Sequence, residues 1–278
     1  MLNFAEHMAI KPLSEMIHVH MDSIWRILQH IGIDEFSKRS GHQYMTIFGD
    51  LDESRVVYIS DGRKTNTVHQ FADFLKQKAI DTCHIQYAST DMWRAYLRGL
   101  KERFPATICV FDKYHVMTMM NHAVDLVRRR EYKEQKVLKH TRYIWLTSNQ
   151  NLNQQQQVTI DSLSQMNLKT ARAYRIKESL RQLWSHQHRE DAELYLKQWY
   201  FWATHSRLDP IIEFAKIVKT HWTGILNYFQ CKITNGIIEG INSKIKTAMK
   251  RAYGFKSFKY LRIIIYLIAG KLDLPTQC

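Results

Sequence analysis

The 278-residue chain has 45% apolar residues and a formal net charge of +14, with 40 Lys and Arg against 26 Asp and Glu. This length and apolar content allow at least one sizeable core and exclude a disordered tail. The positive charge favours nucleic acid or an anionic membrane surface as partner, and charge alone does not choose between them.

No segment of the sequence has the pattern of a membrane span or a secretion signal. The apolar run Ile263–Ala269 is much shorter than the ~20 residues that cross a bilayer. The four cysteines are scattered without a close pair, which is typical of reduced thiols and not of a disulfide framework or a zinc ribbon. We therefore expect a soluble cytoplasmic protein with no membrane partner.

The first thirty residues have a helical pattern. Two short amphipathic segments, Ile10–Ile17 and Met21–Leu28, flank His18-Val19-His20. They could form the end of a helix-turn-helix, in which Arg26 would be among the residues exposed toward the DNA major groove. A plain helical hairpin would have the same pattern, so both interpretations stay open.

Short apolar runs separated by turn residues follow. They predict three strands in an antiparallel meander, at Ile31–Phe36, Tyr44–Phe48 and Val56–Ile59. A helix should come next, with apolar residues at helical spacing between Val68 and Leu75 and with Thr65 or Asn66 as its cap.

Strands and helices then alternate. The expected order is a strand around His84–Ala88, a helix over Trp93–Leu100 and a strand at Thr107–Phe111. Strands added by crossovers run parallel to their neighbours, so this order predicts an α/β fold with a mixed five-stranded sheet and flanking helices.

The rest of the chain is predicted to be mostly helical. Helices should fill Tyr114–Tyr228, except for the polar stretch Thr147–Gln157, which we interpret as a loop or a helix entry. We expect their aromatic residues to pack in a core: Trp184, Trp199, Tyr200 and Trp202. A helix over Gly236–Ala252 should end at Gly254, and Ser257 should cap the last helix, Phe258–Lys271.

Three carboxylates stand at positions suited to chemistry. Asp34 lies inside an apolar strand, where a carboxylate is costly unless a cation or a donor compensates it. Asp91 follows a predicted buried strand, and Glu239 shares a polar helical stripe with Asn242 and lysines. A salt bridge, a helix cap and a solvated face are the respective plain alternatives. Together the acids could hold two hard cations that bridge a scissile phosphate.

Four segments of the chain resemble a known family in order. The strings Ile33–Ser37, Ser89–Tyr96, Phe111–Val116 and Asn235–Asn242 are similar to the successive signature blocks of the ISL-three family of insertion-sequence transposases. The resemblance implies an RNase H-like core of DDE type, a bacterial nucleoid-associated location and two Mg²⁺ ions, for which Mn²⁺ can substitute. It also implies a large, mostly helical insertion before the last catalytic acid.

Carried onto this sequence, the resemblance assigns the catalytic and metal-binding triad to Asp34, Asp91 and Glu239. Asp112, His115 and Asn235 would lie near the site, and Asp112 competes with Asp91 as second metal ligand. Family members usually begin with a zinc-binding segment and a complete helix-turn-helix. This chain is expected to lack the zinc-binding segment, which puts its recognition of terminal repeats in doubt.

The domain plan that follows has four parts. Residues 1–30 would be a remnant of a helix-turn-helix region, 31–118 the first part of the core, 119–230 the insertion, and 231–278 the end of the core with the helix of Glu239.

Basic residues indicate where DNA would lie. The expected DNA-binding residues are Arg26, Asn242, Lys244, Lys246, Lys250 and Arg251. A second basic run, with Arg128–Arg130 at its start, could face DNA or simply be a solvated face.

The leading functional hypothesis is a DDE transposase that cleaves DNA at insertion-sequence ends and joins them to target DNA, as a homo-oligomer on DNA. The alternatives are a catalytically silent DNA-binding remnant or inhibitor, and an RNase H-like nuclease without strand transfer.

Overall fold

The computed structural model describes residues 28–39, 43–252, 254–255 and 257–271. The expected helix-turn-helix remnant, including Arg26, lies outside the described residues except for its last positions. The chain divides into two compact units, the first formed by residues up to Val110 and from Ile233 onward, and the second by Phe111–Lys232. The four-part domain plan stays a prediction. We call these parts the sheet unit and the helical unit.

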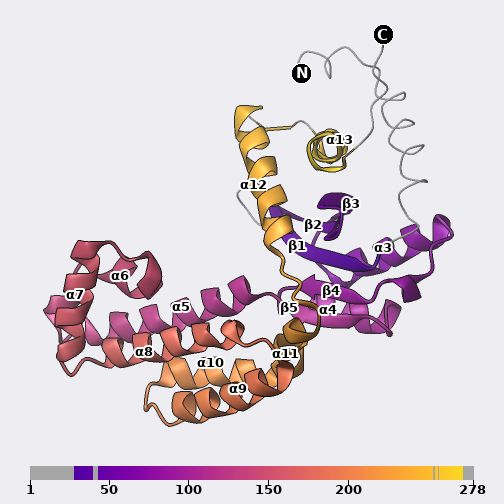
Figure 1. The fold of residues 1–278 in the computed structure, drawn as a ribbon. Coiled ribbons are helices and arrows are strands. Elements are labelled where there is room, and N and C mark those ends of the chain that lie inside the picture. The colour runs from indigo at the N-terminus through magenta and orange to yellow at the C-terminus, as the bar shows by residue number, and fades with distance from the viewer. Residues whose placement is uncertain (1–27, 40–42, 253, 256, 272–278) are drawn as a thin grey trace. The chain divides into compact units, whose positions relative to one another are not determined.

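The sheet has five strands in the order β3-β2-β1-β4-β5 (Figure 1). Its members are β1 (His30–Arg39), β2 (Gln43–Asp50), β3 (Arg55–Asp61), β4 (Tyr87–Thr90) and β5 (Ile108–Phe111). The first three form an antiparallel meander, and β4 pairs with β1 in parallel. The predicted α/β fold with a mixed five-stranded sheet is confirmed, and it is consistent with an RNase H-like core.

Four helices complete the described part of the sheet unit: α3 (Thr65–Gln77), α4 (Arg94–Arg103), α12 (Gly236–Arg251) and α13 (Phe258–Ala269). Ser257 caps α13 by accepting a hydrogen bond from the Tyr260 N–H, as predicted. The predicted cap of α3 is wrong, because Lys64 is the capping residue and its side chain makes no capping hydrogen bond.

The strand predicted around His84–Ala88 begins later, at Tyr87. The preceding residues, Thr82–His84, form a short 3-10 helix in which Asp81 accepts a hydrogen bond from the Cys83 N–H. A side chain that bonds local backbone groups offers the chain an alternative to strand pairing. This turn therefore displaces the start of the strand without changing its end near Asp91.

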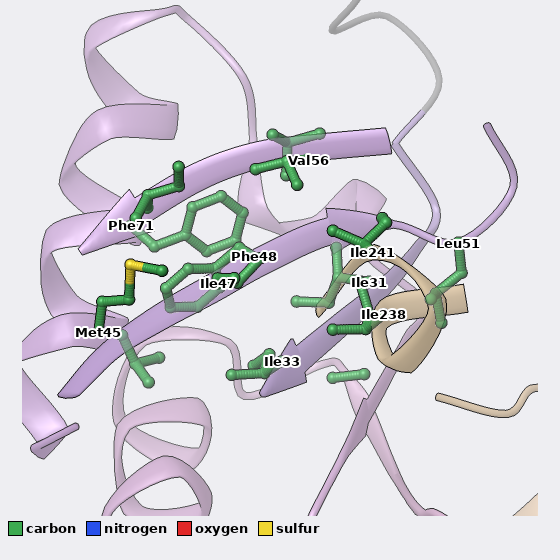
Figure 2. Packing of buried hydrophobic residues seen from close by; sticks show 14 of the residues in the cluster. Ile31, Ile33, Met45, Ile47, Phe48, Leu51, Val56, Phe71, Ile238 and Ile241 are labelled. Carbon is green, nitrogen blue, oxygen red and sulfur yellow. The ribbon is translucent and has the colours of Figure 1, made fainter. Parts of the chain in front are cut away.

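Apolar side chains from both faces of the meander form the core of the sheet unit (Figure 2). Phe48 stacks on Phe71 of α3 with ring centroids 4.3 Å apart, and Phe71 stacks on Phe104. The apolar residues of α12 pack in this core, since Ile238, Ile241 and Ile245 are all buried. Burial of such side chains contributes roughly 1.5–3 kcal/mol each, so α12 is held firmly on the sheet.

The helical unit is helical almost throughout, as predicted. Its helices are α5 (Lys113–Glu131), α6 (Arg142–Leu146), α7 (Gln154–Gln165), α8 (Lys169–Gln182), α9 (Arg189–Thr204), α10 (Asp209–Thr220) and α11 (Trp222–Cys231), with short 3-10 turns between some of them. The polar stretch is a helix entry: Asn153 and Gln156 form a capping box at the start of α7.

The aromatic core of the helical unit differs in one respect from expectation. Trp199 and Trp184 are buried, together with Trp145. Trp202 is 40% exposed, because it lies at the edge of the buried face of α9, which consists of Ala192, Leu196, Trp199 and Ala203. The prediction that Trp202 packs in the core is therefore wrong.

Buried charged groups join the ends of helices in this unit. The Glu131 carboxylate, at the end of α5, accepts hydrogen bonds from the backbone N–H groups of Lys169 and Thr170 at 2.7 Å and from the Thr170 hydroxyl. Buried Lys177 donates to the carbonyls of Trp145 and Thr147 at the end of α6, both at 2.8 Å. Each charge opposes the partial charge of the helix end that it caps.

Two expected absences can be checked within the described residues. Among the described residues, Cys83, Cys109 and Cys231 form no disulfide with one another. Among the helices of the described ranges, none has the length and apolar character that crossing a membrane requires.

Candidate active site

Asp34 is a buried carboxylate in the middle of β1, with a donor on each oxygen. Its Oδ1 accepts a hydrogen bond from the Glu35 backbone N–H, and its Oδ2 accepts one from the Asn242 side-chain amide, both at 2.8 Å. Asp34 is only 8% exposed. These two hydrogen bonds fix the orientation of the carboxylate.

The parallel pairing of β1 with β4 places Asp91 beside Asp34. Ile33 lies opposite Thr90 in the register, so Asp34 and Asp91 are the next residues along two adjacent strands. The β4 strand ends at Thr90 and leaves Asp91, which accepts a hydrogen bond from the Trp93 N–H, half-buried. The two acids are therefore neighbours across the sheet, although they lie 57 positions apart in the sequence.

Two glycines set how closely α12 approaches this sheet. Gly32 of β1 and Gly49 of β2 lie opposite each other, and Ile238 of α12 packs over both. A Cβ atom on Gly32 would lie 2.5 Å from Ile238 Cγ1, and one on Gly49 would lie 2.1 Å from Ile238 Cδ1. Figure 2 shows Ile238 beside Ile31 and Leu51. The α12 helix can therefore pack this close to the sheet because the two glycines have no side chains.

Glu239 lies on the face of α12 that meets β1. Asn235, which precedes α12, donates from its buried side chain to the Ile33 carbonyl at 3.4 Å, and Asn242 donates to Asp34. Residues spaced i, i+4 and i+7 share one face of a helix, and Glu239 occupies the middle position between these two asparagines. Glu239 is itself half-buried. The face of α12 that carries Glu239 is therefore joined to β1 by Asn235 and Asn242.

Several carboxylates act on the buried hydroxyl of Tyr96 in α4. Burial raises the pKa of Tyr96, its hydrogen bond with Thr46 acts in the opposite direction, and the carboxylates of Asp91, Glu35 and Asp34 raise it further. The Tyr96 hydroxyl therefore stays protonated.

The donor set also fits a hard cation. Carboxylate and amide oxygens are the ligands that Mg²⁺ and Mn²⁺ prefer. The Asn242 Oδ1 atom is buried and accepts no hydrogen bond from the part of the chain that the structure describes. A buried amide oxygen next to Asp34 is an acceptor that a bound cation or its water would satisfy.

Comparisons with known proteins identify the family of this chain. The family model for DDE transposases of the ISL3 type, here called the ISL-three family, matches residues 31–265. The chain belongs to the ISL-three family of transposases.

Curated relatives are similar over most of this chain. The transposase for insertion sequence element IS1001 of Bordetella parapertussis is 30% identical over 244 residues, which cover 85% of this chain and 60% of that relative. The transposase for insertion sequence element IS1557 of Mycobacterium tuberculosis (strain H37Rv) is 28% identical over 259 residues, 83% of this chain and 57% of the relative. The chain thus spans about three fifths of the length of these relatives.

Membership in the ISL-three family implies use of a divalent metal and agrees with the four segments on which the resemblance was based. Asp112 and His115 of the third segment begin the helical unit. Asp112 caps α5, accepting hydrogen bonds from the N–H groups of Tyr114 at 2.8 Å and His115 at 3.3 Å. Its expected place near the metal site stays a prediction.

The residues of α12 that were predicted to bind DNA differ in solvent exposure. The side chains of Lys244, Lys246, Lys250 and Arg251 are exposed, while Asn242 is buried against Asp34. The lysines and the arginine are thus accessible to a phosphate backbone. Sequence reasoning placed Asn242 at the DNA and missed its contact with Asp34, because the amide spacing alone does not reveal which strand the helix meets.

The second basic run has a structural role in part. Asp125 is buried and receives hydrogen bonds from Arg128 and Arg129 at 2.9 Å, with Arg142 at 3.4 Å. Burial acts to raise the pKa of Asp125, but the hydrogen bond from Arg128 and the charges of the three arginines outweigh it, so the pKa is lowered. Arg130 pairs with exposed Asp209. This run is therefore more than a solvated face, because a buried carboxylate orders Arg128 and Arg129.

Proposed function

We propose that this chain catalyses metal-dependent DNA strand cleavage and strand transfer for an insertion sequence, with Asp34, Asp91 and Glu239 as ligands of two Mg²⁺ ions. The observation that carries the proposal is the hydrogen bond between Asn242 and Asp34, two residues 208 positions apart. It joins α12, which carries Glu239, to β1. The β1 strand pairs with β4, and Asp91 directly follows β4. Family membership supplies the reaction class.

The bound metal would activate the attacking water or 3′-hydroxyl and stabilise the leaving oxygen. The contribution of the chain itself is to hold the ligands in place. We propose that Asn242 is a positioning residue: its amide group fixes Asp34 while its own helix carries Glu239 one turn earlier. This role accounts for the burial of Asn242, which a contact with the DNA backbone does not.

DNA would be held by backbone contacts that do not read sequence. Exposed Lys244, Lys246, Lys250 and Arg251 extend the helix of Glu239 with positive charge. Phosphate contacts of this kind weaken steeply as salt is raised. We further propose, from the family resemblance, that the chain acts on DNA as a homo-oligomer and that Asp112 and His115 lie near the bound metal.

The test is cleavage and strand transfer by the purified full chain, on DNA carrying the inverted repeats that flank its gene, with Mg²⁺ or Mn²⁺. Asp34→Asn, Asp91→Asn and Glu239→Gln should each abolish cleavage and leave DNA binding intact. Glu53→Gln is the matched control, because Glu53 is an exposed acid on the turn between β2 and β3.

Each alternative predicts a different result. A DNA-binding remnant or inhibitor would bind DNA without cleavage by the unmodified chain, and a nuclease would cleave without joining. Full activity in Asp91→Asn combined with loss in Asp112→Asn would transfer the second ligand to Asp112. Retained cleavage in Asp34→Asn or Glu239→Gln would refute the proposed site.

A further inference from the structure

Trp93 is an exposed aromatic residue next to a proposed metal ligand. It directly precedes α4, and its backbone N–H donates to Asp91 Oδ1 at 3.0 Å. The residue is 42% exposed. Leaving part of an indole in water forgoes stabilisation that burial would give. Single exposed aromatic residues are common on protein surfaces, so it is the contact of Trp93 with Asp91 that points to a role for the ring.

The indole of Trp93 is held in one orientation by Arg63. Its Nε1–H donates to the Arg63 carbonyl at 3.0 Å, and the Arg63 guanidinium lies 5.1 Å from the centre of the indole. Arg63 in turn lies 4.0 Å from the ring centre of Tyr44 and donates to Glu35 at 3.0 Å. Four segments of the sheet unit thus fix one exposed ring before any ligand arrives, which lowers the entropic cost of binding.

We propose that Trp93 stacks on an unpaired nucleobase of the DNA strand that enters the site at Asp91. The proposal rests on the proposed function, because the strand must approach the metal ligands. An indole stacks on any base, since every base has a π-face, and an adjacent arginine adds cation–π and phosphate attraction. Bases inside a duplex are already stacked, so Trp93 recognises an unpaired base near the cleaved phosphate and not a particular sequence.

A purely structural role is the competing explanation, since Trp93 also contacts Arg63. The two roles make different predictions. Loss of a structural contact would weaken binding of every DNA form equally, while loss of a stacking surface would affect only DNA that offers an unpaired base. Trp202 of α9 is a matched control, with 40% exposure against 42% for Trp93.

The experiment measures binding of fluorescently labelled DNA to the full chain in a chelator, so that no cleavage occurs. One probe is a blunt duplex, the second has a single-stranded 3′ tail, and the third has the same tail without bases. Trp93→Ala should weaken binding of the tailed duplex about 5- to 100-fold and leave the blunt duplex unchanged. Trp93→Phe should keep most of the affinity, and Trp202→Ala should change neither probe.

The baseless tail tests the proposal with the unmodified protein, so the test stands even if Trp93→Ala fails to fold. The wild-type chain should bind the baseless tail as weakly as Trp93→Ala binds the normal tail. Equal affinity of the wild type for the two tails, or equal weakening of blunt and tailed DNA by Trp93→Ala, would overturn the proposal. Because no metal is present, these results are separate from a failure of the catalytic test.

Discussion

The sheet unit and the helical unit both bury charged groups, and they do so for different reasons. In the helical unit, Glu131 and Lys177 each cap the end of a helix within the same unit. In the sheet unit, Asp34 is placed with Asn242, whose side-chain oxygen meets no donor from the described residues. A buried charge therefore indicates a site for an external ligand only where the surrounding chain leaves acceptors to be satisfied.

The largest effect should come from a substitution at Gly32, one of the two glycines against which α12 packs. Gly32→Ala should lower cleavage about 100-fold, because its Cβ would meet Ile238, Asn235 and Leu51 at 2.5–2.8 Å and displace the helix of Glu239. Overpacking should also cost roughly 1–3 kcal/mol of stability in thermal unfolding. Gly240→Ala, with nothing within 4 Å of its Cβ, is the control. Equal cleavage by the two variants would contradict this account of the site.

The capping role of Glu131 predicts a loss of stability. Glu131→Ala should destabilise the protein by about 2–3 kcal/mol in denaturant unfolding, because three donors at the start of α8 lose a charged partner. Exposed Glu134→Ala should change little. A stable Glu131→Ala variant with impaired metal binding would instead place Glu131 among ligand-binding groups and break the contrast between the units.

Asn242 should affect metal binding more than stability. Asn242→Ala should weaken Mn²⁺ binding, measured by calorimetry without DNA, and lower cleavage about 10- to 100-fold, as is typical when a group that orients a metal ligand is removed. Exposed Ser243→Ala, the next residue of α12, serves as the control. Unchanged Mn²⁺ affinity in Asn242→Ala would remove the positioning role.

Lys177 should give an effect that is visible only as a dependence on pH. Burial lowers the pKa of Lys177 to about 8 from 10.5, while the adjacent Glu178 raises it. The unfolded chain therefore binds more protons between these values, and the free energy of unfolding should rise with pH from about 8 to 10, by at most about 1.4 kcal/mol per pH unit.

Chemical denaturation of the wild type and Lys177→Met at several pH values measures this contribution. The difference in stability between the two proteins should change across this range and stay constant below pH 8. An invariant difference would show that Lys177 has an ordinary pKa.

The sequence by itself determined the succession of strands and helices along the sheet unit and the parallel addition of strands by crossovers. These features depend on periodicity and turn residues, which are local properties of the chain. Even there, a local hydrogen bond accepted by Asp81 from the Cys83 N–H moved the start of β4, and Trp202 is exposed where an aromatic pattern predicted a core. Family resemblance, and not spacing, selected the three acids among the 26 acidic residues.

Only the tertiary structure decided which polar groups meet. Nothing near Asn242 in the sequence indicates Asp34, and nothing near Gly32 indicates that Gly49 will face it and that Ile238 will cover both. Lys177 likewise does not differ in type from the exposed lysines around it. Such pairings depend on which surfaces of distant elements pack together, and the free energy of that packing is summed over the whole core, so no single segment encodes it.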